Sequence, residues 1–194
     1  MLEKTSWLYF DVMLSQKATD VPRRNIEIKA RLSSLGGTRE IARALTGVDP
    51  DVLQQRDTYF HCSHGRLKLR EMPGRPAELI AYRREDFAGA RPSDYQILEL
   101  ANAADAEAVL AGSLGIRTVV EKRRELHLYR GVRIHIDEVR ELGNFLEFEA
   151  VLEPEDEDSI GYDKLKELQI HFGISVNDVL TESYVDMLEA LAVG

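Results

Sequence analysis

The sequence predicts an α+β protein in which roughly eight antiparallel strands close into a β-barrel, with helices packed on the outside. Two observations support this fold. Several short segments alternate charged and apolar residues, so that each strand has one ionic and one apolar face. About three or four other segments carry apolar residues at helical spacing and can cover an apolar outer surface of the barrel. The charged faces would then line an interior large enough for a small ligand.

The clearest strand spans residues 24–32, where polar and apolar residues alternate strictly. Its polar face carries both charge signs, on Asn25, Glu27, Lys29 and Arg31. A turn at residues 33–37 then leads to Thr38, a predicted N-cap, and to a helix that Gly47 can end. Asp49-Pro50 interrupts the chain after this helix.

Three strands follow in the first half of the chain. An aromatic strand at 55–60 and a basic strand at 65–71 are joined by a hairpin turn at 61–65. The basic strand aligns three cations on one face: Arg66, Lys68 and Arg70. A strand at 78–86 places Arg84 on the face of Ile80 and Tyr82, and we interpret Arg83 on the opposite face as a surface charge.

The second half continues with a loop at 87–92, a strand from 93 to 100, a helix at 103–114 and a strand at 119–129. This last strand aligns Lys122 with Arg124. Two acidic strands follow: 133–137 aligns His135 with Asp137, and 144–149 aligns Glu147 with Glu149. The separation of basic from acidic strands suits an anion that is bound through a cation.

An acidic linker at 153–158 precedes the last two predicted helices. The first carries Leu165 and Leu168 on its apolar side and stops at Gly173. The second is predicted to begin with Ser175 as its cap, and its apolar side includes Val179, Leu180, Tyr184, Leu188 and Leu191.

Length and composition limit the possible functions. With 194 residues and 44% hydrophobic content, we expect a single domain over 22–192, preceded by an N-terminal extension over 1–21. The apolar stretch in that extension is too short to cross a bilayer and does not resemble a secretory signal. A net charge of -9 argues against nonspecific nucleic-acid binding, and we expect no membrane partner.

The cysteine and histidine content argues against a catalytic cysteine and against a zinc site. Cys62 is the sole cysteine and cannot form an internal disulfide, which fits a reducing, cytoplasmic location. Nothing in the sequence indicates a group that would lower its pKa, so it is a poor nucleophile. Together with His61 and His64 it does not complete a tetrahedral zinc site.

The strand at 24–32 is similar to the Glu-x-Glu-x-Lys signature of the CYTH superfamily, also called triphosphate tunnel metalloenzymes. The resemblance covers nearly all of residues 23–191 and is closest to the subgroup that resembles class IV adenylate cyclases. It includes the segments 57–60, 65–71, 79–86, 91–95, 120–124, 136–139 and 142–149. One departure matters, because Asn25 occupies the position of the first signature glutamate.

The resemblance implies metal-dependent hydrolysis of inorganic or organic triphosphates inside the charged tunnel, with Mg²⁺ or Mn²⁺ as cofactor and a metal-activated water as nucleophile. Tripolyphosphate, thiamine triphosphate and ATP are the expected small-molecule substrates. The implied metal ligands are Glu27, Asp137, Glu147 and Glu149, with Asn25 as a weak contributor. The implied phosphate ligands are Lys29, Lys68, Arg70, Arg84, Lys122 and Arg124, and the expected catalytic residues are Lys29, Glu27 and Arg84.

Two other functions remain open from the sequence. The same triphosphate clamp would serve a class IV adenylate cyclase, in which the ribose 3′ hydroxyl of ATP attacks the α-phosphate. The loss of a carboxylate at Asn25 would suit a binding module for polyphosphate or a nucleotide that does not turn it over. Arg31 and Arg66 are expected at the tunnel mouth, and His135 is interpreted as a hydrogen-bonded interior residue rather than a general base. The oligomeric state is open, and a homodimer is one possibility.

Overall fold

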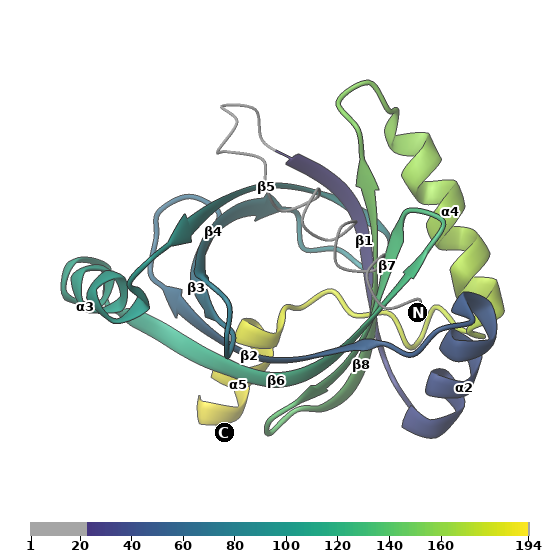
Figure 1. Cartoon of the computed structure of the whole chain (residues 1–194), viewed down its shortest axis with the longest axis horizontal. Coiled ribbons are helices and arrows are strands. Elements are labelled where there is room, and N and C mark those ends of the chain that lie inside the picture. Colours follow the sequence, from purple (N-terminus) through teal and green to yellow (C-terminus); the bar gives the residue numbers. More distant parts are fainter. Residues whose placement is uncertain (1–22, 194) are drawn as a thin grey trace, which may run out of the picture.

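The computed structural model describes residues 23–193 and shows eight antiparallel strands in a closed barrel (Figure 1). The strand order is β1-β5-β4-β3-β2-β6-β7-β8, and β8 pairs with β1 to close it. The predicted antiparallel barrel is therefore confirmed, whereas the extension predicted over residues 1–21 lies outside the described residues.

The strands are β1 (Arg23–Arg31), β2 (Asp51–Phe60), β3 (Arg66–Glu71), β4 (Ala77–Arg84), β5 (Arg91–Leu100), β6 (Ile116–Tyr129), β7 (Val132–Val139) and β8 (Gly143–Leu152). The helices in the described part of the chain are α2 (Leu35–Thr46), α3 (Ala103–Leu114), α4 (Asp158–His171) and α5 (Tyr184–Val193). Strands β2, β5 and β6 begin earlier than the alternation predicts, because pairing with neighbouring strands extends them beyond their periodic segments.

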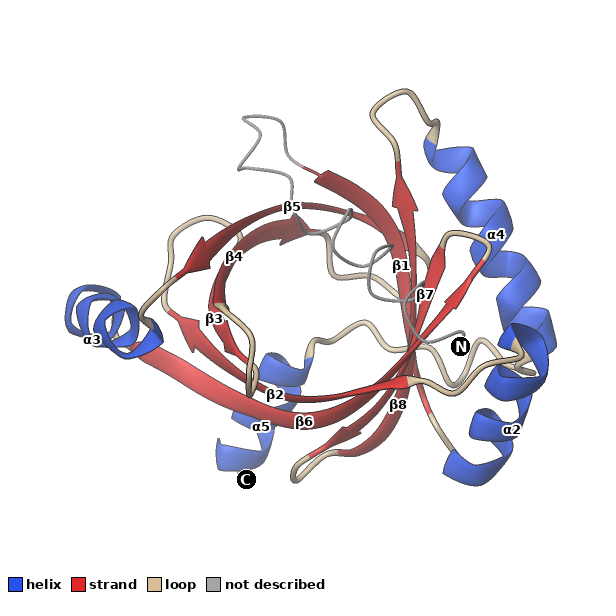
Figure 2. Ribbon diagram, viewed as in Figure 1, coloured by secondary structure: helices blue, strands red, loops and turns tan. Residues whose placement is uncertain are grey.

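The outward faces of the strands form the hydrophobic core together with the helices, as expected. Helices α2 and α4 lie on one side of the barrel and α3 on the other (Figure 2). The largest core cluster joins apolar residues of β1, β7 and β8 to Leu165 and Leu168 of α4. Gly161 allows α4 to approach β1 closely, since a Cβ at this position would lie 2.4 Å from Ile26.

Two predicted helix starts are wrong. Helix α2 begins one turn earlier than expected, because the Ser34 hydroxyl accepts a hydrogen bond from the backbone N–H of Gly37, and Thr38 lies inside the helix. The last helix begins after Ser183 rather than Ser175. The segment between Ser175 and Ser183 runs alongside β1, where the Leu180 backbone N–H donates to the Lys29 carbonyl oxygen.

The ends at Gly47 and Gly115 agree with the sequence prediction. In the part of the chain that the structure describes, none of the helices combines the length and apolar character needed to span a membrane.

Candidate active site

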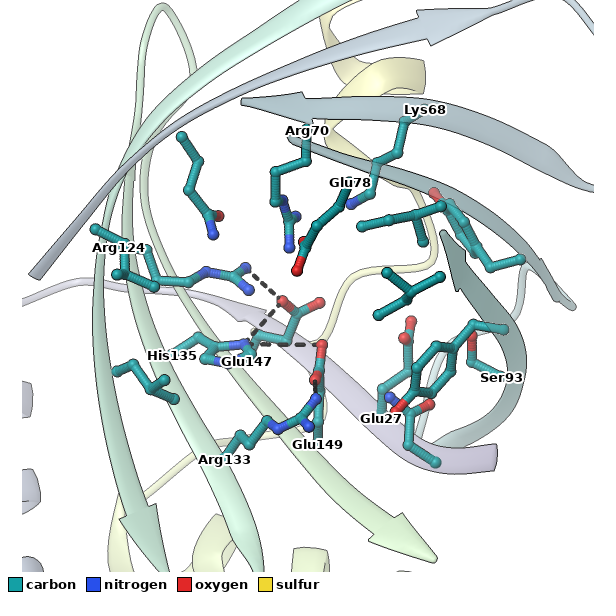
Figure 3. A pocket seen from close by; sticks show the side chains of 18 of the residues that line it. Glu27, Lys68, Arg70, Glu78, Ser93, Arg124, Arg133, His135, Glu147 and Glu149 are labelled. Carbon is teal, nitrogen blue, oxygen red and sulfur yellow. Dashed lines mark hydrogen bonds and ion pairs between the residues drawn. The ribbon is translucent and has the colours of Figure 1, made fainter. Parts of the chain in front are cut away.

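The barrel encloses a cavity of about 530 Å³ that is lined by side chains from all eight strands and by the start of α5. Nine Lys and Arg residues and four Glu residues line it, so the cavity has an excess of positive charge in a protein whose net charge is -9. Such a local excess of cations suits a small polyanion. Figure 3 shows side chains from several strands converging on this space.

The pairing of β1 with β8 places four of the predicted catalytic and metal-binding residues at facing positions of the two strands. Lys29 is opposite Glu147 and Glu27 is opposite Glu149, so all four side chains point into the barrel. The Lys29 ammonium donates to Glu147 Oε1 at 2.6 Å, and both side chains are buried. The alternation seen in the sequence thus places this acidic and basic set on the inner wall.

Arg124 joins the two predicted acidic strands. Its guanidinium forms a two-pronged contact with Asp137 at 2.7 and 2.6 Å. It also donates to Glu147 at 2.8 Å (Figure 3). Burial alone would raise the pKa of Glu147, but Lys29, together with His135 and Arg124, holds this pKa well below its usual value. Glu147 is therefore a carboxylate at neutral pH.

Asp137 lies behind Arg124 rather than on the cavity wall. The side chain is fully buried, and its second oxygen also accepts a hydrogen bond from the Tyr184 hydroxyl at 2.9 Å. Both oxygens are thus engaged by the protein, and the predicted role of Asp137 as a metal ligand stays a prediction.

Among the residues that the structure describes, His135, Glu147 and Glu149 form the group best placed to hold a metal ion. One potential ligand atom from each residue lies within 4.8 Å of the others. Burial and the nearby Arg124 lower the pKa of His135, which keeps the imidazole neutral and able to donate a lone pair at neutral pH. Two carboxylates and one imidazole fit a divalent cation, and the nitrogen ligand suits Mn²⁺ better than Mg²⁺.

Glu27 lies apart from this group, although its backbone pairs with that of Glu149. Its carboxylate accepts a hydrogen bond from Arg84 at 2.6 Å and lies 3.6 Å from the fully buried Arg91. Two buried nitrogens of Arg84, Nη2 and Nε, have no hydrogen-bond partner among the described residues; Nη2 lies 3.5 Å from Asp86 in an ion pair, which leaves Nε. That nitrogen is available to an anion in the cavity.

A second cationic group is built around Asp57. This fully buried carboxylate accepts hydrogen bonds from Arg70 and Lys68 and lies 3.6 Å from the Lys122 ammonium. Burial and the neighbouring Arg124 lower the pKa of Lys122 to about 7. The three cations face the cavity, while Asp57 holds them from behind.

The structure therefore brings together the predicted phosphate ligands Lys29, Lys68, Arg70, Arg84, Lys122 and Arg124 around one cavity. Arg31 and Arg66 are not among the lining residues, and Arg83 is exposed as expected. His61, Cys62 and His64 are exposed in the turn between β2 and β3.

Four residues of the site have no role predicted from the sequence: Asp57, Arg91, Arg133 and Tyr184. Arg133 alternates with the apolar residues Val132 and Ile134, so strand alternation could have found it, whereas Asp57 lies between Arg56 and Thr58 and no alternation marks it. Arg91 fell in a predicted loop but begins β5. Tyr184 begins α5 and lies 3.9 Å beneath the Lys29 ammonium, a contact that no local pattern indicates.

Comparisons with known proteins agree with this architecture. The profile of the CYTH domain family matches residues 23–184. No curated protein matches the sequence.

Several solved structures have a similar fold but low sequence identity to this chain. A conserved hypothetical protein from Pyrococcus furiosus gives a TM-score of 0.73 at 19% identity, covering 84% of this chain and 98% of that chain. A Vibrio parahaemolyticus protein provisionally described as an adenylate cyclase gives 0.67 at 18% identity, covering 85% and 97%. A Hippeastrum protein described as having a dominant triphosphatase activity gives 0.60 at 16% identity, covering 86% and 95%. At these identities the likeness establishes the fold.

Proposed function

Because this chain belongs to the CYTH domain family, we propose that it is a divalent-metal-dependent phosphohydrolase that cleaves triphosphates inside its barrel. The observation that carries this proposal is the lining of the cavity. An excess of Lys and Arg surrounds one group of two carboxylates and an imidazole, which is the combination that a triphosphate with a divalent cation requires. The triphosphatase activity ascribed to the Hippeastrum protein supports the choice of hydrolysis.

The cationic side chains would bind the phosphate chain by exchanging partners. In the structure, Lys29 and Arg124 are held by Glu147, and Lys68 and Arg70 are held by Asp57. Phosphate oxygens can replace part of these contacts, with the arginines binding through two nitrogens and the lysines as point charges. The unpartnered Arg84 Nε can join them without breaking an existing contact.

The carboxylates released by this exchange would hold the cation, together with His135. Glu147 and Glu149 would contribute oxygen ligands and His135 a nitrogen ligand, while Glu27 and Asp137 would join only if Arg84 and Arg124 moved toward phosphate. A bound Mn²⁺ or Mg²⁺ would supply Lewis-acid neutralisation of the phosphate charge.

Catalysis by this chain would then consist of positioning and charge stabilisation. We assign Lys29 and Arg84 to the transferring phosphoryl group and Glu27 to the orientation of Arg84, which it contacts at 2.6 Å. Tyr184, 5% exposed, and Ser183 line the cavity beside Lys29 and exclude water from that end. No covalent intermediate is required.

The test is product analysis by ³¹P NMR with tripolyphosphate, ATP or thiamine triphosphate, each with Mn²⁺ or Mg²⁺. We expect orthophosphate from wild type and its loss in Glu147→Gln, a change of nearly equal shape. Glu121→Gln, on a half-buried β6 residue outside the cavity, is the matched control and should retain turnover.

Other products would identify the alternatives. Pyrophosphate with cyclic AMP from ATP would establish a cyclase, as the description of the Vibrio protein suggests for that protein. Binding without any product would establish a non-catalytic polyphosphate or nucleotide-binding module, which Asn25 at the first signature position favours. Unchanged orthophosphate release in folded Glu147→Gln would contradict the proposed site.

A further inference from the structure

The cavity changes character along the strands. Its inner part contains the charged pairs around Glu147, whereas two residues before Glu27 along β1 the uncharged side chains of Asn25 and Ser93 form a neutral level beside the cations Arg23 and Arg84. Asn25 there pairs with Ser93 of β5 and with Val151 of β8. Two residues in a strand span about 7 Å, so this neutral level lies one step outward from the Glu27 and Glu149 carboxylates.

The neutral level contains buried polar groups that the protein leaves without partners. Asn25 is 5% exposed, and its side-chain oxygen has no hydrogen-bond partner among the described residues. The hydroxyl of Tyr95, 8% exposed, likewise lacks a hydrogen bond of good geometry, although it lies close enough to the Arg133 guanidinium to interact with it. Ser93, on the same strand as Tyr95, is 4% exposed and also lines the cavity. Because leaving a buried polar group unpaired is costly, such groups indicate a ligand that supplies the missing contacts.

At and beyond this level the cavity wall also carries apolar side chains, alongside the cation Arg23. Ile97, Leu126, Leu128 and Val151 line it, and Leu128 is 56% exposed, which places it toward the open end. An inorganic phosphate chain gains nothing from apolar side chains, whereas an organic group does.

We propose that Asn25, Ser93 and Tyr95 form a neutral subsite for the uncharged, hydrogen-bonding part of an organic triphosphate. The Asn25 oxygen would accept a hydrogen bond from the ligand, the Tyr95 and Ser93 hydroxyls would donate, and the apolar wall would cover the rest of the organic group. The inference rests on the proposed function and specifies its substrate class. The replacement of the signature glutamate thus changes a charged position into a contact for a neutral group.

The charges around this level disfavour a cationic organic group. Arg23 and Arg133 both line the cavity near it, and Arg133 contacts Glu149 at 3.4 Å. Nucleoside triphosphates carry hydroxyl and amino groups without positive charge, whereas thiamine triphosphate carries a thiazolium cation. The subsite therefore favours the former.

The test is isothermal titration of the full chain with imido analogues of ATP and of tripolyphosphate, which resist hydrolysis, in the presence of Mn²⁺. We expect wild type to bind the ATP analogue about tenfold more tightly than the tripolyphosphate analogue. In Tyr95→Phe and Asn25→Ala this affinity ratio should fall about threefold to tenfold, the contribution of one or two hydrogen bonds. Tyr162→Phe, on α4 outside the barrel, is the matched control and should keep the wild-type ratio.

The outcomes separate the subsite from the proposed function. If wild type binds both analogues equally, or if the ratio is unchanged in both folded variants, the subsite is refuted while triphosphate binding stands. If neither analogue binds wild type, the proposed function is refuted together with the subsite. A thermal melt of each variant verifies folding, and Ser93→Ala serves as a further variant should Asn25→Ala fail to fold.

Discussion

Replacement of Asp57 by asparagine tests whether the cavity is held together by charge compensation. Asp57 is fully buried and accepts hydrogen bonds from Arg70 at 2.7 and 2.8 Å and from Lys68 at 3.1 Å. Burial alone would raise the pKa of Asp57, but Arg70, Lys68 and Lys122 hold it well below its usual value. The asparagine side chain keeps the shape and removes the charge, which leaves these cations facing one another.

The structure sets the size of the effect. Removing one partner of a buried ion pair costs about 3–5 kcal/mol. Because Lys68 and Arg70 retain 12% and 14% side-chain exposure, water can relieve part of the repulsion, and we expect the lower end of that range. For a chain of this length about 3 kcal/mol corresponds to a fall in Tm of about 6–12 °C.

The assay is thermal unfolding followed by circular dichroism, in phosphate-free buffer, with and without tripolyphosphate and Mn²⁺. The polyanion replaces the missing negative charge, so it should raise the Tm of Asp57→Asn more than that of wild type. The difference between the proteins should shrink as pH falls toward the low pKa of Asp57, since protonation removes the same charge.

Asp94→Asn provides the control for this experiment. Asp94 is 48% exposed and pairs with Arg24, so its replacement should cost about 1 kcal/mol or less. A loss below about 1 kcal/mol in Asp57→Asn, or equal stabilisation of both proteins by tripolyphosphate, would refute the reasoning.

Three further predictions concern protonation, packing and the metal. Lys122, with a pKa of about 7, must be protonated to bind an anion, so the affinity for tripolyphosphate should fall as the pH rises above neutral. Titrations at several pH values should show a weaker pH dependence in Lys122→Arg. Gly161→Ala should lower the Tm by several degrees because its Cβ would meet Ile26 at 2.4 Å, whereas Gly112→Ala in α3, with no atom within 4 Å, should be neutral or stabilising by about 1 kcal/mol. Mn²⁺ should support tripolyphosphate binding better than Mg²⁺, and His135→Gln should reduce this preference; equal affinities with both metals in wild type would contradict the assignment of His135.

Strand alternation predicted which side chains face the barrel interior because the period of two is a property of the backbone alone. It placed Lys29, Glu147 and Arg124 inside and the apolar faces of their strands under the helices, as the structure shows. It could not show which charged groups pair, because pairing depends on register between strands that are far apart in sequence. Glu27 therefore contacts Arg84, 57 positions away, although its predicted role grouped it with the other carboxylates.

The remaining errors arise at the ends of elements. Ser34, Thr38, Ser175 and Ser183 all have side chains suited to an N-cap, and the choice among them depends on where tertiary packing lets the chain leave the barrel. The predicted environment of Tyr184 depends on which of these residues caps the last helix. In a helix that starts near Ser175, Tyr184 would be one residue of the apolar side. The observed start after Ser183 instead places the Tyr184 ring beneath the Lys29 ammonium, and the Tyr184 hydroxyl donates to Asp137.

The side chains of the cavity already provide the charge balance that a bound triphosphate would need. Glu147 and Asp57 each hold two cations by hydrogen bonds, and removing either carboxylate would expose those cations to mutual repulsion. A triphosphate that arrives with a divalent cation brings negative charge for these Lys and Arg side chains and positive charge for Glu147 and Glu149. Each group therefore changes partner without becoming unpaired. The unfavourable desolvation of these ions thus occurs during folding rather than during binding. A polyanion without the metal would satisfy the cations but leave the displaced carboxylates uncompensated, which is why binding should require the metal even where no cleavage occurs.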